Sequence, residues 1–114
     1  MQLVEVNWVV NPFRGDRFEE AWRPLAEAAL DYGASAYSFF RSDTDRLRFR
    51  QVAYFDDRLD WERYWYSEQV SLAREDLSGW YQVPLQAVWY TVVDSGTRER
   101  GGAAVVSPAQ GGPL

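Results

Sequence analysis

Residues 34–55 read ASAYSFFRSDTDRLRFRQVAYF. Two runs rich in aromatic residues, 34–41 and 47–55, flank the polar segment 42–46. Strand-like runs separated by a few polar residues are typical of a β-hairpin. The stretch therefore predicts two antiparallel strands joined by a short loop.

An amphipathic helix is predicted before the hairpin. Apolar residues recur every three or four positions over residues 18–32, and charged residues occupy the other sides. We expect Asp16 and Glu19 to form a capping box at its start and Gly33 to take a left-handed conformation after its end. Pro24 lacks an amide hydrogen, so a kink or an irregular first turn is expected there.

A second helical region is predicted after the hairpin. Asp56 or Asp57 can cap a helix that carries an aromatic stripe over residues 61–65. A further amphipathic stretch follows over residues 72–77, and we expect the helix to break near Ser67.

One more strand is predicted at each end of this pattern. Residues 3–10 alternate between apolar and polar side chains, and residues 83–93 form a second strand-like run. Pro84 indicates an edge strand or a bulge, because proline cannot donate to a sheet ladder. From residue 97 to residue 114 glycine, proline and alanine follow no period, which predicts a flexible tail after a single domain of residues 1–96.

The predicted elements follow in the order strand, helix, strand, strand, helix, strand. This is the ferredoxin-like βαββαβ arrangement of the α+β class, a four-stranded antiparallel sheet with two helices on one face. Both faces of the predicted strands are largely apolar, but two helices can bury only one of them. We therefore expect a homodimer that packs sheet against sheet.

The composition removes many kinds of chemistry. The 114 residues include no Cys and no His, and all 12 basic residues are Arg. Metal sites built on Cys or His, disulfides, thiol or histidine nucleophilic centres, haem ligation through these residues and lysine Schiff bases all lack their essential side chain. We expect neither a metal nor another cofactor.

Charge and hydropathy narrow the expected partners and location. The formal net charge is −5, and phosphate binding needs clustered positive charge, so neither a nucleic acid nor a membrane partner is expected. The apolar run near the N-terminus is interrupted by Glu5 and Asn7 and lacks a basic leader, which predicts a cytoplasmic protein. Phe, Trp and Tyr make up 17% of the chain, with 6 Trp, which is more aromatic surface than a small core usually holds.

The pattern resembles the dimeric α/β-barrel superfamily and, within it, the antibiotic-biosynthesis-monooxygenase-like domains. The resemblance covers residues 1 to about 94 and rests on hydrophobic spacing and aromatic placement. The stretches that carry it are FRQVAYFDD (49–57), WERYWYS (61–67), VP (83–84) and YTVV (90–93). The resemblance implies a ferredoxin-like fold assembled as a dimeric α/β barrel.

The resemblance also implies where a site lies. Cofactor-independent oxygenases of aromatic polyketides in this family are described as using an Asn and a Trp of the third strand and a Tyr of the second helix. The matching positions here are Gln51, Phe55 and Trp61, and all three depart from that pattern. The resemblance therefore implies the location of a pocket more than a reaction.

Gln51 is the candidate catalytic residue, and Phe49, Phe55, Trp61 and Trp65 are the candidate ligand-binding residues. The Gln51 amide lies among apolar side chains on one face of the third strand, so it needs a hydrogen-bond partner, which a ligand carbonyl or hydroxyl could supply. Aromatic rings suit a small aromatic ligand, such as a polyketide or a quinol, in a pocket between the sheet and the second helix. The alternative is a structural Gln bonded to backbone or to Tyr hydroxyls, with the aromatic stripe as ordinary core.

Two functions follow from these alternatives. In a cofactor-independent monooxygenase, the anion of an electron-rich phenol would itself deliver an electron to dioxygen, while Gln51 donates to the oxyanion and the rings exclude water. Otherwise the chain is a non-catalytic dimeric small-ligand-binding or regulatory module. A ligand-sized cavity beside Gln51 would favour the enzyme, and a Gln51 side filled by aromatic rings would favour the module.

Four polar residues are expected on the sheet face assigned to the dimer: Glu5, Asn7, Arg48 and Arg50. Strands one and three are neighbours in the ferredoxin-like order. Glu5 should therefore pair with Arg50 or Arg48, either across the strands or across the dimer.

Overall fold

The computed structural model describes residues 1–98. Its elements are β1 (Gln2–Val9), α1 (Gly15–Glu27), the 3-10 helix η1 (Ala28–Tyr32), β2 (Ala36–Arg41), β3 (Arg48–Tyr54), α2 (Arg58–Trp65), α3 (Glu68–Asp76) and β4 (Ala87–Thr91). This is the predicted βαββαβ order, with the second helical region divided into α2 and α3. Residues 99–114, which hold most of the expected tail, lie outside the described residues.

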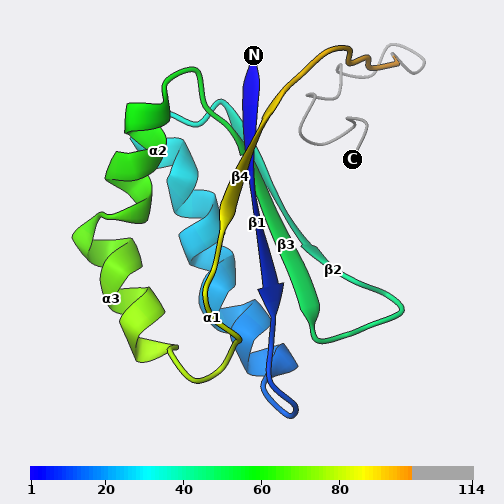
Figure 1. Cartoon of the computed structure of the whole chain (residues 1–114), viewed down its shortest axis with the longest axis vertical. Coiled ribbons are helices and arrows are strands. Elements are labelled where there is room, and N and C mark those ends of the chain that lie inside the picture. Colours follow the sequence, from blue (N-terminus) through cyan, green and yellow to red (C-terminus); the bar gives the residue numbers. More distant parts are fainter. Residues whose placement is uncertain (99–114) are drawn as a thin grey trace.

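The four strands form one antiparallel sheet in the order β2-β3-β1-β4. Figure 1 shows all three α-helices on the same side of this sheet. The α+β ferredoxin-like prediction is confirmed. β4 is an edge strand, because it pairs with β1 alone, but it is shorter than the predicted run 83–93, so Pro84 lies before the strand rather than within it.

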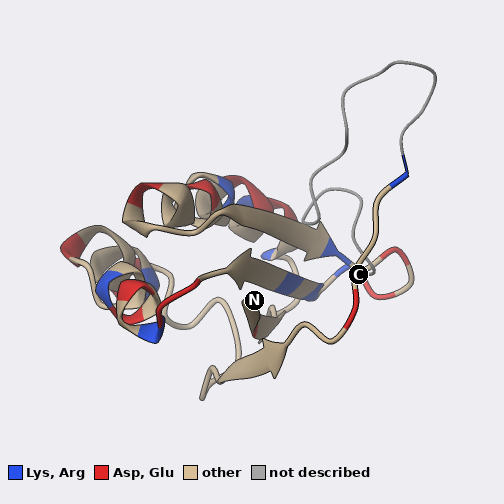
Figure 2. Ribbon diagram, turned by 90° about the horizontal axis from the view of Figure 1, so that it is seen from above, with Lys and Arg blue, Asp and Glu red and all other residues tan. Residues whose placement is uncertain are grey.

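The core lies between the sheet and the helices. Val4, Val6 and Trp8 of β1 point to this side and are buried, as are Phe18 and Trp22 of α1. Most charged residues belong to the helices and the hairpin loop, whereas the strands carry few, chiefly arginines (Figure 2). The spacing of apolar residues along each strand and helix thus determines which face of that element is buried.

Side chains cap two of the helices. Asp57 Oδ1 accepts a hydrogen bond from the backbone N–H of Leu59 at 2.8 Å, and Ser67 Oγ accepts one from that of Val70 at 3.2 Å. The cap at Ser67 starts α3, so the predicted break at this residue is confirmed. Gly33 follows η1 with a φ of 106°, the left-handed conformation expected of it.

The predicted capping box at the start of α1 is wrong. The helix begins at Gly15, and its N-cap residue, Arg14, makes no side-chain capping bond. The carboxylates of Asp16 and Glu19 instead accept hydrogen bonds from Arg41 of β2, at 2.8 and 3.0 Å. The box fails because α1 begins before Asp16, which therefore lies inside the first turn rather than at the N-cap position.

The helices are short. α1 has 13 residues and contains Pro24, and its α-helical geometry gives way to the 3-10 turns of η1 at Ala28. The irregularity expected around the proline therefore lies after it rather than in the first turn. Within residues 1–98, no helix has the length and apolar character needed to cross a membrane.

Candidate functional site

Gln51 is placed by β3 on the helix side of the sheet. In the ladder it lies between Val6 of β1 and Phe39 of β2, and its side chain is only 1% exposed. Apart from tyrosines, it is the one polar residue in the buried core of residues 1–98. A buried amide needs partners for both its oxygen and its nitrogen.

Both ends of the Gln51 amide have such partners. Trp22 Nε1 donates to Gln51 Oε1 at 2.9 Å, and Gln51 Nε2 donates to the Tyr64 hydroxyl at 2.9 Å. The Tyr64 hydroxyl donates in turn to the carbonyl oxygen of Leu25 at 2.7 Å. This hydrogen-bonded chain joins α1, β3 and α2 through the core, and it matches the structural alternative of a Gln bonded to a Tyr hydroxyl.

Tyr64 is the titratable group in contact with Gln51. Burial raises the pKa of its hydroxyl to about 12, and the hydrogen bond from Gln51 and the charge of Arg74 offset only part of that shift. At neutral pH the hydroxyl therefore keeps its proton and acts as a donor to Leu25. Among residues 1–98, no group of three or more acidic side chains is placed to hold a metal ion.

Aromatic rings pack closely around this network. Trp61 and Trp65 stack with ring centroids 5.0 Å apart, and Phe55 lies edge-on to Trp61 at 5.9 Å. None of the three is more than 9% exposed. Phe49 lies farther along β3, with its ring 5.0 Å from Phe18 of α1. The structure thus brings three of the four predicted ligand-binding rings together and places the fourth in another part of the core.

Arg74 of α3 is a part of this region that sequence reasoning missed. Its guanidinium carbon lies 4.5 Å from the centroid of the Trp65 ring, and its Nη2 donates to the Trp65 carbonyl oxygen at 2.7 Å. The guanidinium therefore packs against Trp65, which also stacks on Trp61. Trp65 is the last residue of α2, and the helix break near Ser67 is the signal that could have pointed to a contact between α3 and this end of α2.

Three cavities lie at the hairpin end of the sheet. One of about 330 Å³ opens on the helix-free face and is lined by Asn7, Phe40, Arg41, Ser42, Arg48, Phe49 and Arg50. Cavities of about 450 and 180 Å³ lie beside it, and Arg41 lines all three. None of these three is lined by Gln51, Phe55, Trp61 or Trp65.

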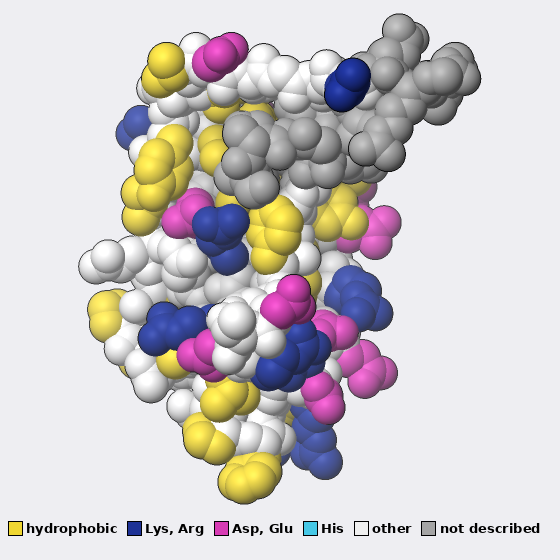
Figure 3. Space-filling view, turned by 90° about the vertical axis from the view of Figure 1, so that its right-hand side faces the viewer, with side chains coloured by type: hydrophobic (Ala, Val, Ile, Leu, Met, Phe, Trp, Pro, Cys, Tyr) yellow, Lys and Arg dark blue, Asp and Glu magenta, His cyan; other side chains and the backbone are white. Residues whose placement is uncertain are grey.

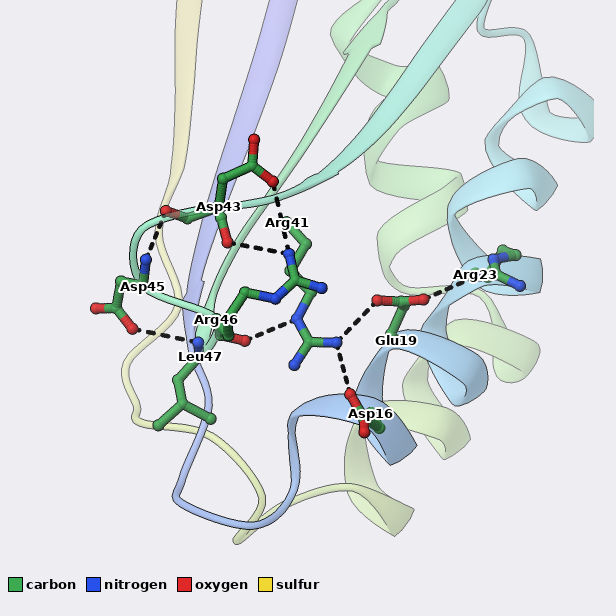
Figure 4. A network of polar contacts seen from close by, with 9 residues as sticks. Asp16, Glu19, Arg23, Arg41, Asp43, Asp45, Arg46 and Leu47 are labelled. Atoms are coloured by element: carbon green, nitrogen blue, oxygen red, sulfur yellow. Dashed lines mark hydrogen bonds and ion pairs between the residues drawn. The ribbon is translucent and has the colours of Figure 1, made fainter.

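Arg41 links the hairpin loop to α1 through hydrogen bonds (Figure 4). Its Nε donates to the carbonyl oxygen of Arg46 at 2.7 Å, and its Nη1 bonds the carboxylates of Asp16 and Glu19. The hydrogen bond from Arg41 is the main reason that the pKa of the Asp16 carboxyl lies below its ordinary value. Gly15 leaves room for this contact, because a Cβ there would lie 2.5 Å from Arg41 Nη2.

The helix-free face has an apolar part and a charged part. Leu3, Val52 and Tyr54 form a small apolar cluster. Toward the hairpin the same face carries Glu5, Asn7, Arg48 and Arg50, as the alternation of β1 and β3 predicts. The expected ion pair is present across the strands, with Arg50 Nη1 at 3.5 Å from Glu5 Oε2. In Figure 3, side chains of both charge signs gather in the lower half of this side of the molecule.

Comparison by sequence gave no match to a protein-family model or to a curated protein. Comparison with solved structures gave clear matches. A Nitrosomonas europaea protein named after the antibiotic biosynthesis monooxygenases has a TM-score of 0.74 and 21% identity, over 82% of this chain and 100% of that one. A Deinococcus radiodurans protein named in the same way has a TM-score of 0.69 and 14% identity, over 94% and 99%. This is the antibiotic-biosynthesis-monooxygenase-like fold.

SnoaB from Streptomyces nogalater, a cofactor-independent oxygenase, shares the monooxygenase-like fold with a TM-score of 0.67 and 14% identity, over 82% of this chain and 94% of that one. At such identities the likeness establishes the fold, and the chemistry must be argued from the residues. In this chain the residues beside the expected site are those of the hydrogen-bonded network around Gln51.

Proposed function

We propose that this chain is a non-catalytic homodimeric module of monooxygenase-like fold, in which the space between the sheet and α2 is a structural core. The observation that carries the proposal is the state of Gln51. Its amide oxygen and nitrogen are bonded to Trp22 and Tyr64, and its side chain is 1% exposed. Both polar ends of the amide are thus engaged, so a substrate would have to displace Trp22 or Tyr64 to bond to it.

The chemistry of the surrounding groups supports the same proposal. A reaction at this place needs a group that takes or gives a proton near the operating pH. Tyr64 keeps its proton because burial raises its pKa to about 12, and its hydroxyl is already bonded to Leu25. The Trp61 indole is no substitute, since it does not ionise in this range.

The helix-free sheet face supports the dimer. Its apolar cluster of Leu3, Val52 and Tyr54 lies beside Val88 and Tyr90 of β4, which are 39% and 47% exposed. The charged residues Glu5, Asn7, Arg48 and Arg50 follow on the same face. An apolar centre with a polar surround is typical of protein interfaces, and a second copy of the chain supplies a matching face.

Sedimentation velocity at micromolar concentration tests the dimer. We expect a dimer for the unaltered chain and a monomer for Tyr90→Glu, because a buried unpaired carboxylate is costly. Leu72→Glu is the matched control: Leu72 is 50% exposed, close to the 47% of Tyr90, but it belongs to α3 on the opposite side. A monomeric unaltered chain, or equal effects of the two substitutions, would contradict the proposed interface.

A second candidate function is the cofactor-independent oxygenation of a small aromatic substrate, such as a polyketide or a quinol. The likeness to SnoaB and an amide on β3 facing the rings of α2 favour it. A phenolate substrate would pass one electron to dioxygen, and the phenoxyl radical and superoxide would combine at a ring carbon that carries a hydrogen. The peroxide anion would take a proton from solvent, and loss of water from the hydroperoxide, with that hydrogen, would leave the quinone. Gln51 would donate to the phenolate oxygen, and Phe55, Trp61 and Trp65 would enclose the ring, while Phe49 packs on Phe18 in another part of the core. This requires the bonds of Gln51 to Trp22 and Tyr64 to open.

Oxygen uptake separates the two candidates. With an anthrone or a quinol as substrate, the proposal predicts the same rate with the unaltered chain as with buffer alone. A saturable rate that Gln51→Leu abolishes, in a variant that still folds, would support the oxygenase and overturn the non-catalytic assignment. Saturable quenching of Trp fluorescence by the same compounds would report their entry into the core.

A further inference from the structure

The cavity of about 330 Å³ on the helix-free face has the size of a small-molecule site. Three neighbouring strands build it. Arg50 of β3 lies opposite Asn7 of β1 and opposite Phe40 of β2, so these three side chains stand in one row across the sheet. The cavity lies on the other face of the sheet from the Gln51 side chain, which points to the helices.

The charge of the lining has one sign. Arg41, Arg48 and Arg50 line the cavity, and no carboxylate does. Arg41 is committed to Asp16, Glu19 and the Arg46 carbonyl. The guanidinium groups of Arg48 and Arg50 therefore determine which ligands the cavity can bind. They make the cavity locally positive, although the chain as a whole carries a net charge of −5.

Arg48 and Arg50 keep donors for a ligand. Arg48 donates to Asp45 Oδ2 through Nε, at 3.0 Å. This bond uses one edge of the guanidinium and does not involve its other edge. Arg50 approaches Glu5 only to 3.5 Å. Glu5 also accepts a hydrogen bond from Asn7 Nδ2 at 2.9 Å, so it retains a partner when Arg50 turns toward a ligand. A planar fork of N–H donors matches a carboxylate.

An aromatic wall accompanies these donors. The guanidinium carbon of Arg50 lies 5.2 Å from the centroid of the Phe40 ring, within the range of a cation–π contact. Phe40 itself lines the cavity. A planar ring that enters can stack on the guanidinium or on Phe40 while its acidic group meets the arginines.

We propose that this cavity binds an aromatic carboxylate, with Arg48 and Arg50 holding the carboxylate and Phe40 packing on the ring. The proposal deepens the proposed function, in that it gives the ligand class of a non-catalytic module. The site lies on the face assigned to the dimer, at its charged end, so the partner copy would border the ligand.

Calorimetric titration with 2-naphthoate tests the site. We expect saturable binding at low ionic strength that weakens as salt is added, because the attraction is between charges. 2-Naphthamide, which keeps the rings and loses the charge, should bind at least tenfold more weakly. Equal binding of the two compounds, or no saturable binding at millimolar concentration, would overturn the proposal.

Four substitutions locate the binding. Arg48→Gln and Arg50→Gln should each weaken 2-naphthoate binding about tenfold, and Arg50→Lys should recover only part of the loss because it keeps the charge without the fork. Arg63→Gln is the matched control: like Arg48 it is exposed and pairs with a carboxylate three residues away, but it lies on α2. Binding that survives both Arg48→Gln and Arg50→Gln, or that Arg63→Gln weakens equally, would refute the site.

The outcome is separable from that of the proposed function. Sedimentation reports the dimer and oxygen uptake reports catalysis, and neither requires the cavity to be filled. Binding of 2-naphthoate to a chain that consumes oxygen would leave the site standing and remove the non-catalytic assignment. A dimer that shows neither catalysis nor 2-naphthoate binding would leave the proposed function standing and remove the proposed site.

Discussion

Replacing Gln51 by leucine tests whether the amide network is structural. The two side chains are close in volume, so the change creates little cavity. It removes the acceptor of Trp22 Nε1 and the donor to the Tyr64 hydroxyl. Tyr64 keeps its own bond to the Leu25 carbonyl, so the lasting defect is one buried indole N–H without a partner.

The expected cost follows from that defect. An unpaired buried donor costs about 1 to 3 kcal/mol, which is a large share of the roughly 5 to 15 kcal/mol that stabilises a typical domain. We expect Gln51→Leu to lower the free energy of unfolding by that amount and still to fold. Urea denaturation at neutral pH measures it, and the slope with urea should not change if the folded and unfolded states stay as compact as before.

A double-mutant cycle with Trp22→Phe isolates the bond itself. The phenylalanine has no N–H, so Gln51→Leu should cost less in a Trp22→Phe background than in the unaltered chain. Contacting residues commonly show coupling of about 0.5 to 3 kcal/mol. Additive effects, or a Gln51→Leu variant as stable as the unaltered chain, would refute the structural role and return the amide to the oxygenase hypothesis.

Three further predictions concern pH, backbone and capping. The pKa of Tyr64 is raised to about 12, so the unfolded chain loses this proton first and stability should fall by about 2 to 3 kcal/mol as pH rises from about 10 to 12; urea unfolding at pH 9 and 11 should show a shallower fall for Tyr64→Phe. Gly33→Ala should cost more than Gly79→Ala in thermal unfolding, because both positions have a left-handed φ but only at Gly33 would a Cβ lie 2.9 Å from Asp60 Oδ2; equal costs would exclude this contact as a cause. Ser67→Ala should lower the free energy of unfolding by about 1 kcal/mol through loss of the α3 cap, and an unchanged midpoint in urea would contradict it.

The fold was predictable because its signals are local. The alternation of residues 3–10, the polar hairpin loop, the cap at Asp56 or Asp57 and the break near Ser67 each need only a few neighbouring residues. Strand order predicted that Glu5 pairs with Arg50 or Arg48, and the structure shows Arg50. The capping box failed because α1 begins before Asp16, and the guanidinium that binds both carboxylates comes from another element.

The candidate site was predictable only in part. The period of β3 places Gln51 on the helix side, but its partner Trp22 lies 29 residues away on α1, and no sequence spacing indicates that bond. Whether rings enclose a cavity or fill it depends on how they interdigitate, which composition does not determine. The cavity of about 330 Å³ lies on the opposite face from the one expected, where arginines rather than an aromatic stripe line it.

The pairing of β1 with β4 constrains how the chain can fold. β1 lies between β3 and β4, and its residues Gln2 and Val6 pair with Thr91 and Ala87. Contacts between such distant parts of a chain form slowly, because a large loop must close first. Until β4 arrives, one side of β1 is an open edge that another molecule can add to. The most aggregation-prone species of this protein should therefore be a three-stranded intermediate, and hydrogen exchange should show the β1–β4 amides protected later than those of the β2–β3 hairpin.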